Sequence, residues 1–195
     1  MRRCWIMLAA LAAVAHAAAA QPQRQAAAAA GPSATSPSAA APAVPVRAAD
    51  PAKGTVTGLP IPRFAALRAD EVNMRAGPGT RYPVEWVYKR RNLPVEILRE
   101  FEVWRLVRDP DGVQGWVHTA VLTGRRSFVV RGEEQVMRRS AEPEAAAVAR
   151  LKGGVVGRVR GCEANAGWCE VQVGDYRGYL PRAAFWGTYQ DEAVN

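Results

Sequence analysis

The sequence predicts an all-β chain that contains two small barrels in tandem. From Phe64 onward, short runs rich in Val, Ile, Trp and Tyr alternate with turn residues, a pattern typical of small β-barrels. The stretches "GWVHTAVLTG" (115–124) and "GYLPRAAFWG" (178–187) have the same length and the same plan. Upstream, Trp104 and Trp168 lie 11 and 10 residues before the two opening glycines. An internal repeat of this kind predicts two copies of one domain.

Residues 1–20 have the order of a secretory signal peptide: two arginines, an apolar run and a stretch of small residues. The apolar run is too short to span a bilayer comfortably, so we expect cleavage, no stable membrane span afterwards, and a periplasmic protein. Residues 21–62 are rich in Ala, Pro and Ser and poor in large apolar side chains. Such a segment cannot bury enough surface to offset its chain entropy, which predicts a disordered Ala/Pro-rich linker.

The first barrel is expected over residues 63–124. In "VEWVY", Val84, Trp86 and Tyr88 share one face, and Trp86 is predicted to lie in the core. Met74 is also predicted to point inward, and "DPDG" (109–112) predicts a hairpin turn. Glu100 and Glu102, one strand step apart, are interpreted as surface charge.

The second barrel is expected over residues 125–188, followed by a C-terminal tail at 189–195. Removal of residues 1–20 leaves two cysteines, Cys162 and Cys169. An even number of cysteines in an exported chain favours a disulfide between them, with the Cα atoms within about 7 Å. Because almost no linker separates the two copies, we expect the barrels to pack on each other.

The motif "VNMRAGPGTRYPV" (72–84) resembles the opening of bacterial SH3-like domains, whose usual form is Asn-x-Arg-x-Gly-Pro. The strand of Trp104, the hairpin and "GW" at 115–116 extend this similarity, and residues 57–188 resemble exported tandem SH3-like proteins of proteobacteria. The second copy, "VMRRSAEPEAA", keeps Arg138 but lacks the Asn and the Gly-Pro. The resemblance implies two SH3-like β-barrels and an envelope-binding module that binds peptidoglycan or its peptide bridges.

Two interpretations of the motif stay open. In the structural one, Asn73 holds a turn, the glycines supply positive φ, and Arg75 pairs with a nearby acid. In the functional one, the motif loop flanks a shallow groove in which Tyr82, Tyr88 and Trp104 present aromatic surface and Arg75 or Arg81 meets a carboxylate. The candidate ligand-binding residues are therefore Arg75, Tyr82, Tyr88 and Trp104.

No catalytic, metal-binding or cofactor-binding constellation is found in the sequence, which predicts a non-catalytic protein without a metal or cofactor. The net charge is +8, and it falls to +6 without residues 1–20. For an exported protein, anionic envelope polymers are the expected acidic neighbours rather than nucleic acid. Two hypotheses remain: a module that binds peptidoglycan or its stem peptides, and an adaptor that docks on another envelope protein.

We predict that the mature protein begins near Gln21 and is found in the periplasm, because residues 1–20 have the order of a cleaved signal. Mass spectrometry of the native protein should give a mass that lacks these residues. An intact Met1 in a cytoplasmic fraction would show that this prediction is wrong.

Overall fold

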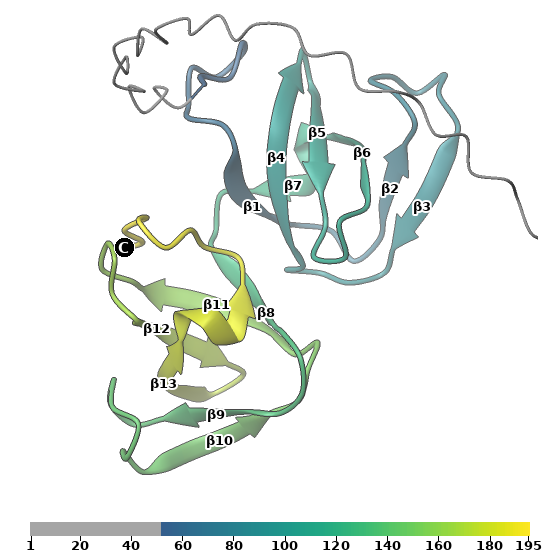
Figure 1. The fold of residues 1–195 in the computed structure, drawn as a ribbon. Helices are drawn as coiled ribbons and strands as arrows, with labels where there is room; N and C mark the ends of the chain where they lie inside the picture. Colours follow the sequence, from purple (N-terminus) through teal and green to yellow (C-terminus); the bar gives the residue numbers. More distant parts are fainter. Residues whose placement is uncertain (1–51) are drawn as a thin grey trace, which may run out of the picture. The chain divides into compact units, whose positions relative to one another are not determined.

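A computed structural model describes residues 52–195, which form strands, two short 3₁₀ helices and loops (Figure 1). The all-β fold class is confirmed. The predicted signal peptide at 1–20 and most of the predicted linker at 21–62 lie outside the described residues. No helix among the described residues has the length and apolar character to cross a bilayer.

Barrel 1 is a seven-stranded antiparallel sheet in the order β3-β2-β6-β5-β4-β1-β7. A 3₁₀ turn, η1 (Thr119–Val121), precedes the last strand. The strands are β1 (Arg63–Leu67), β2 (Val72–Arg75), β3 (Val84–Tyr88), β4 (Pro94–Phe101), β5 (Trp104–Arg108), β6 (Gln114–His118) and β7 (Leu122–Thr123).

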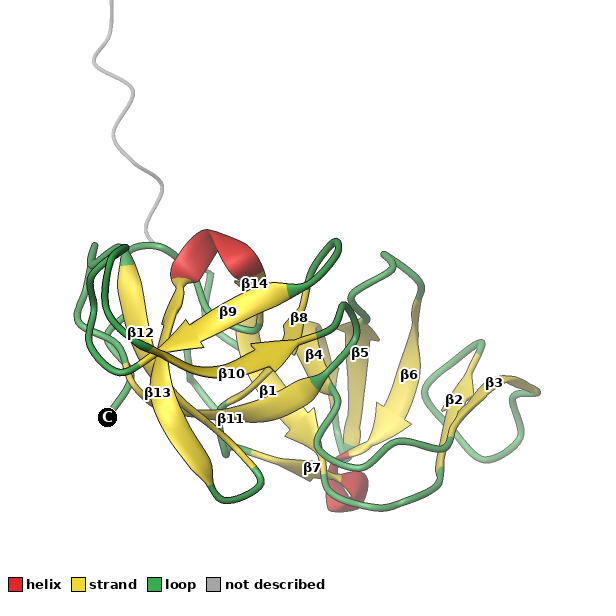
Figure 2. Ribbon diagram, turned by 90° about the horizontal axis from the view of Figure 1, so that it is seen from below, coloured by secondary structure: helices red, strands yellow, loops and turns green. Residues whose placement is uncertain are grey.

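Barrel 2 repeats this topology strand for strand, in the order β10-β9-β13-β12-β11-β8-β14 (Figure 2). The 3₁₀ turn η2 (Arg182–Ala184) stands where η1 stands in barrel 1. Its strands are β8 (Ser127–Val130), β9 (Gln135–Arg138), β10 (Ala147–Leu151), β11 (Val156–Gly161), β12 (Trp168–Val173), β13 (Tyr176–Pro181) and β14 (Phe185–Trp186). The identical order establishes that the repeat in the sequence is a repeat of the fold.

A methionine and a glycine meet at the same place in both barrels. Met74 on β2 is 1% exposed, as predicted, and a Cβ added to Gly115 on β6 would lie 2.5 Å from Met74 Cγ. In barrel 2, a Cβ on Gly178 would lie 2.9 Å from Met137 Cγ. The opening glycines of the repeat are therefore required by close packing between β2 and β6, and between β9 and β13.

Trp86 differs from its predicted place in the core, because its side chain is 56% exposed. Strand β3 lies at the end of the sheet, and its pairing with β2 shifts register between Met74 and Arg75. Only Tyr88, the last residue of β3, is buried. An alternating pattern on a terminal strand therefore predicted more burial than the strand provides.

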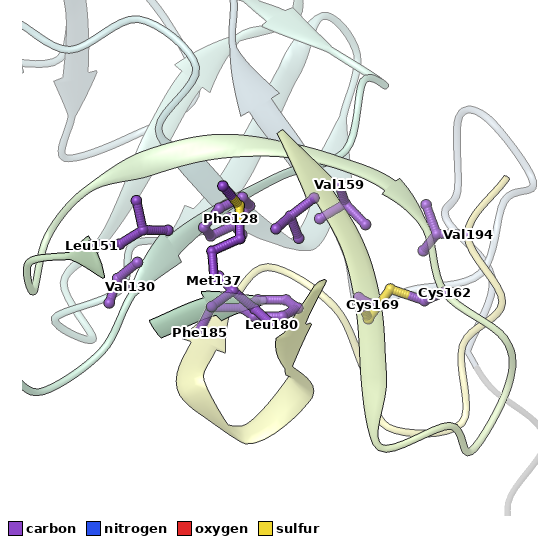
Figure 3. Close-up of a cluster of buried hydrophobic side chains, with 11 residues drawn as sticks. Phe128, Val130, Met137, Leu151, Val159, Cys162, Cys169, Leu180, Phe185 and Val194 are labelled. Atoms are coloured by element: carbon purple, nitrogen blue, oxygen red, sulfur yellow. A yellow bond between two sulfur atoms is a disulfide. The ribbon is translucent and has the colours of Figure 1, made fainter. Parts of the chain in front are cut away.

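The core of barrel 2 is continuous with the predicted disulfide (Figure 3). Cys162 and Cys169 are bonded, with Cα atoms 4.5 Å apart, which confirms the prediction. Phe128 is fully buried and its ring lies 5.2 Å from that of Phe185. Val194 also packs in this cluster and pairs with Cys162 through two backbone hydrogen bonds of 2.8 and 2.9 Å. Residues 189–195 are thus part of the fold of barrel 2, not a separate tail.

The predicted linker extends too far, because residues 53–60 form an ordered turn on barrel 1. The turn is closed by a bridge between Lys53 and Pro60 and is held by the carboxylate of Glu100 at the end of β4. This carboxylate accepts hydrogen bonds from the backbone N–H groups of Val56 (2.9 Å) and Thr57 (2.8 Å) and from the Thr57 hydroxyl (2.6 Å). We call residues 53–60 the N-terminal turn.

Glu100 is also the acidic centre of a buried ion-pair cluster. Its carboxylate lies 2.7 Å from the guanidinium of Arg63 and 3.6 Å from that of Arg105, and its side chain is 0% exposed. The interpretation of Glu100 as surface charge was therefore wrong. Burial alone would raise the pKa of Glu100, but the hydrogen bonds from Thr57, Arg63 and Val56 outweigh it and lower the pKa to about 2.

The disulfide occupies the place in barrel 2 that this ion pair occupies in barrel 1. Glu100 pairs with Arg105 one step beyond the Arg99–Leu106 pair of β4 and β5. Cys162 and Cys169 lie one step beyond the corresponding Gly161–Glu170 pair of β11 and β12. Both positions anchor a flanking segment: the N-terminal turn bonds to Glu100, and the C-terminal segment bonds to Cys162.

The two barrels contact each other, as expected from the short connection, and both belong to one compact unit. The ring of Phe64 on β1 lies 4.8 Å from that of Trp186 and 4.7 Å from that of Tyr189. Tyr189 donates its hydroxyl hydrogen bond to Glu96, and Arg126 donates to the Phe64 carbonyl at 2.7 Å.

We predict that Glu100→Gln destabilises the protein at neutral pH by about 3 kcal/mol and removes part of its acid sensitivity. The pKa of Glu100 in the folded protein, about 2, is below its ordinary value of 4.5. Its contribution to stability is therefore complete above pH 4.5 and is lost as the pH falls toward 2.

Urea unfolding between pH 2 and pH 7 measures this contribution, and Glu102→Gln, two residues away and exposed, is the matched control. The prediction would be contradicted if the free energy of unfolding changed with pH equally in the wild type and in Glu100→Gln.

Candidate functional site

The loop between β2 and β3 is held by Arg75 and Tyr82. The Arg75 guanidinium donates hydrogen bonds to the carbonyls of Thr80 (3.1 Å) and Tyr82 (2.7 Å). The ring of Tyr82 lies against Gly77, where an added Cβ would stand 2.5 Å from Tyr82 Cδ1. Neither Gly77 nor Gly79 has a positive φ. The glycine of the motif is therefore needed for close approach of the ring, not for positive φ.

Arg138 has the same role in barrel 2. It donates a hydrogen bond of 2.7 Å to the Ala145 carbonyl across the loop between β9 and β10. The second copy lacks the Asn and Gly-Pro of the motif but keeps this arginine. The shared contact supports the structural interpretation of Arg75: its side chain fixes the loop through backbone carbonyls, and the predicted pairing with an acid is replaced by these bonds.

Tyr88 does not belong to a groove, and its prediction as a ligand-binding residue was wrong. The residue is 6% exposed, packs in the core of barrel 1, and donates its hydroxyl to Asp109 at 2.9 Å. Burial, followed by the hydrogen bond to Asp109, raises the pKa of Tyr88 above its ordinary range. Asp109 in turn accepts the backbone N–H groups of Asp111 and Val113, so the predicted "DPDG" hairpin and Tyr88 form one network.

A groove nevertheless lies beside the motif loop, and we call it groove 1. It has a volume of about 540 Å³ and is lined by the motif loop, the turn between β4 and β5, and the end of β6. The lining residues are Pro78, Gly79, Thr80, Arg81, Phe101, Glu102, Val103, Trp104 and His118. Trp104 therefore lines the groove as predicted, whereas Arg75 and Tyr82 support the wall formed by residues 78–81.

The apolar surface of groove 1 comes from a two-residue turn. Phe101 of β4 pairs with Trp104 of β5, and the two residues between them, Glu102 and Val103, form the turn. Glu102 has a positive φ of 46°. Phe101 is 48% exposed and Val103 is 46% exposed. Trp104 is largely buried, and its ring meets that of His118 edge to face at 5.4 Å. The floor of the groove is thus rigid, and its rim presents two exposed apolar side chains and the charge of Arg81.

Barrel 2 has a corresponding cavity of about 400 Å³ beside its disulfide, which we call groove 2. Trp168 and Tyr179 line it together with Glu163 and Glu170, and Val194 of the C-terminal segment lies in its wall. Groove 2 therefore has an acidic lining, and the C-terminal segment forms part of its wall.

A larger cavity, about 820 Å³, lies between residues 57–65 and residues 189–192. Its charged side chains are mostly paired already: Arg63 and Arg105 with Glu100, and Arg126 with Glu192. This cavity belongs to the packing of the two barrels. Within residues 52–195, no group of three or more His, Cys, Asp and Glu side chains is placed to hold a metal ion.

The comparisons with known proteins identify the repeated domain. The sequence profile described as "Bacterial SH3 domain" matches residues 68–124 and again residues 131–187. No curated protein matches the chain. Among solved structures, NlpC2 and NlpC1 from Trichomonas vaginalis each align with 13% identity and a TM-score of 0.31. The alignments cover 65% and 70% of this chain but only 48% and 49% of those chains, so this chain spans about half their length.

Sequence reasoning missed Phe101 and Val103 as residues of the groove. The signal was present in "EFEVW" (100–104), where two apolar residues flank a glutamate immediately before a core tryptophan. A tight hairpin turn forces such residues outward, because too few residues remain to fold them back onto the core.

We predict that Gly77→Ala destabilises barrel 1 by about 1–3 kcal/mol, because its Cβ overlaps the ring of Tyr82. Gly79→Ala is the matched control, since its Cβ would lie at an ordinary 3.4 Å from Tyr82. Urea unfolding measures both variants. In a Tyr82→Ala background, the two glycine substitutions should lower the free energy of unfolding by nearly the same amount. Equal losses of stability when Tyr82 is present would show that the contact between Gly77 and the Tyr82 ring does not matter.

Proposed function

The chain belongs to the bacterial SH3 domain family, and from this membership we propose that it is a cell-envelope binding module whose groove 1 holds a peptidoglycan stem peptide. Peptide ligands of small barrels lie in shallow grooves that combine apolar contacts with a few charged groups. The observation that carries the proposal is the exposed pair Phe101 and Val103 beside Arg81, on a turn fixed by Trp104.

The chemistry of groove 1 suits a short peptide that carries a carboxylate. Phe101 and Val103 supply apolar contact for small side chains such as those of alanine residues. Arg81 is exposed on the facing wall and can meet a carboxylate, while Glu102 can meet an amine. Because these groups already stand in a rigid frame, binding requires little ordering of the protein.

Barrel 1 is favoured over barrel 2 as the binding domain. The charged lining residues of groove 2, Glu163 and Glu170, would repel a carboxylate. Barrel 2 thus serves mainly as support for barrel 1, with which it shares the contacts of Phe64, Trp186 and Tyr189.

We also propose that the protein acts in the periplasm. The support is the signal-like order of residues 1–20, the disulfide between Cys162 and Cys169, and a net positive charge that favours anionic wall polymers. The alternative role, an adaptor for another envelope protein, would use the same groove for an extended protein segment.

We predict that the purified protein co-sediments with peptidoglycan sacculi and binds isolated stem peptides with a Kd on the order of micromolar to millimolar. Phe101→Ala and Arg81→Ala should each weaken binding by about tenfold without loss of thermal stability, because both side chains are exposed. Tyr88→Ala is unsuitable as a binding test, since it removes a core residue.

Val113→Ala is the matched control, because Val113 is equally exposed (45%) but lies beside the hairpin at the other end of β6. Binding that is unchanged by both groove substitutions would exclude groove 1. Absence of binding to sacculi and to stem peptides at any salt concentration would exclude the wall ligand and leave the adaptor role.

A further inference from the structure

Strand β3 presents an apolar edge that no strand within residues 52–195 covers. It is the terminal strand of barrel 1 and pairs only with β2. Three of its five residues are apolar and exposed: Val84 at 41%, Trp86 at 56% and Val87 at 40%. An exposed edge of this composition has unpaired backbone groups along its length and is a template for pairing with another strand.

The equivalent strand in barrel 2 lacks these features, which makes it an internal reference. Trp86 pairs with Met74 and Ala149 pairs with Met137, so Ala149 occupies the position of Trp86. By the same register, Arg150 stands where Val87 stands. A charged side chain on a terminal strand is a common protection against pairing, and Arg150 of β10 provides one at the position where β3 has the apolar Val87.

We propose that β3 pairs antiparallel with β3 of a second copy of this chain, about a two-fold axis at Val87. In this register Glu85 of each copy lies opposite Lys89 of the other, which gives two ion pairs across the interface. Neither Glu85 nor Lys89 has an ion-pair partner among the described residues. The charges of the strand are thus complementary to the strand itself.

The same register brings the exposed tryptophans together. Trp86 lies on the face of Tyr88, and their ring centroids are 6.4 Å apart. With the axis at Val87, Trp86 of one copy stands opposite Tyr88 of the other, so the two Trp86 residues become diagonal neighbours within reach of each other. A register with its axis at Trp86 instead places Lys89 opposite Pro83 and forms no Glu85–Lys89 pair.

The occupant is a second copy rather than an unrelated strand, because one sequence supplies both halves of the charge pattern and both aromatic partners. The contact is confined to one strand and its flanks, so we expect a reversible dimer with a Kd of about 10–100 μM.

Sedimentation equilibrium of the full two-barrel protein, from low micromolar to millimolar concentration, tests the proposal. Glu85→Lys and Lys89→Glu should each weaken dimerisation by about tenfold, because each places like charges opposite each other twice. The double variant Glu85→Lys/Lys89→Glu should restore the wild-type Kd. Trp86→Ala should weaken the dimer without loss of thermal stability, and Arg150→Glu on β10 is the control that should leave it unchanged.

A protein that stays monomeric at every concentration overturns the proposal. A dimer that is indifferent to the single charge reversals, or one that the double variant does not restore, also overturns it, because the contact would then lie on another surface or in another register.

Discussion

Closure of each barrel depends on a glycine that leaves room for a methionine side chain. Gly115 and Gly178 stand where any Cβ would collide with Met74 or Met137, so β2 and β6, and their counterparts β9 and β13, can approach only because this atom is missing. A domain of about sixty residues buries a smaller fraction of its surface on folding than a larger domain does, so its stability is marginal and a misfit in the core is costly. The same approach positions groove 1, because the motif loop follows β2 and His118 ends β6. Binding surface and barrel closure therefore share one packing contact.

The repeated architecture was accessible from the sequence because its signals are local. Turn residues, paired glycine-aromatic steps and equally spaced tryptophans each reflect one strand or one hairpin, and the two copies reinforce each other. The disulfide was accessible for the same reason, since the two cysteines flank a short loop. The order of the two flanking segments, residues 53–60 and 189–195, could not be predicted in this way. Both segments are short and contain few large apolar residues, and they are held by contacts with Glu100 and Cys162, which lie far from them in the sequence.

The candidate site was predicted in outline, with errors that have a common cause. Alternation along β3 cannot reveal that the strand lies at the end of the sheet. Trp86 was therefore predicted in the core and Tyr88 in the groove, whereas the tryptophan is exposed and the tyrosine lies in the core. The motif loop was correctly placed beside a groove that contains Trp104. Arg75 and Tyr82 do not line the groove but fix the conformation of the loop. A loop with few apolar residues needs internal hydrogen bonds and a packed ring to keep one conformation. Its ligand-facing side is then left to Arg81 and to the turn of Phe101 and Val103.

The exchange of an ion pair for a disulfide at one equivalent position gives the two barrels different vulnerabilities. In barrel 1, the carboxylate of Glu100 holds the N-terminal turn. Strong acid protonates this carboxylate and so weakens the attachment of the turn, but it does not break the disulfide that stands at the equivalent position of barrel 2. In barrel 2, the bond between Cys162 and Cys169 holds the strand end that pairs with Val194, so a thiol reductant weakens the attachment of the C-terminal segment and does not act on the ion pairs of Glu100. The two copies of one fold are thus fastened at one equivalent position by bonds of different chemistry, so neither acid alone nor a reductant alone breaks both.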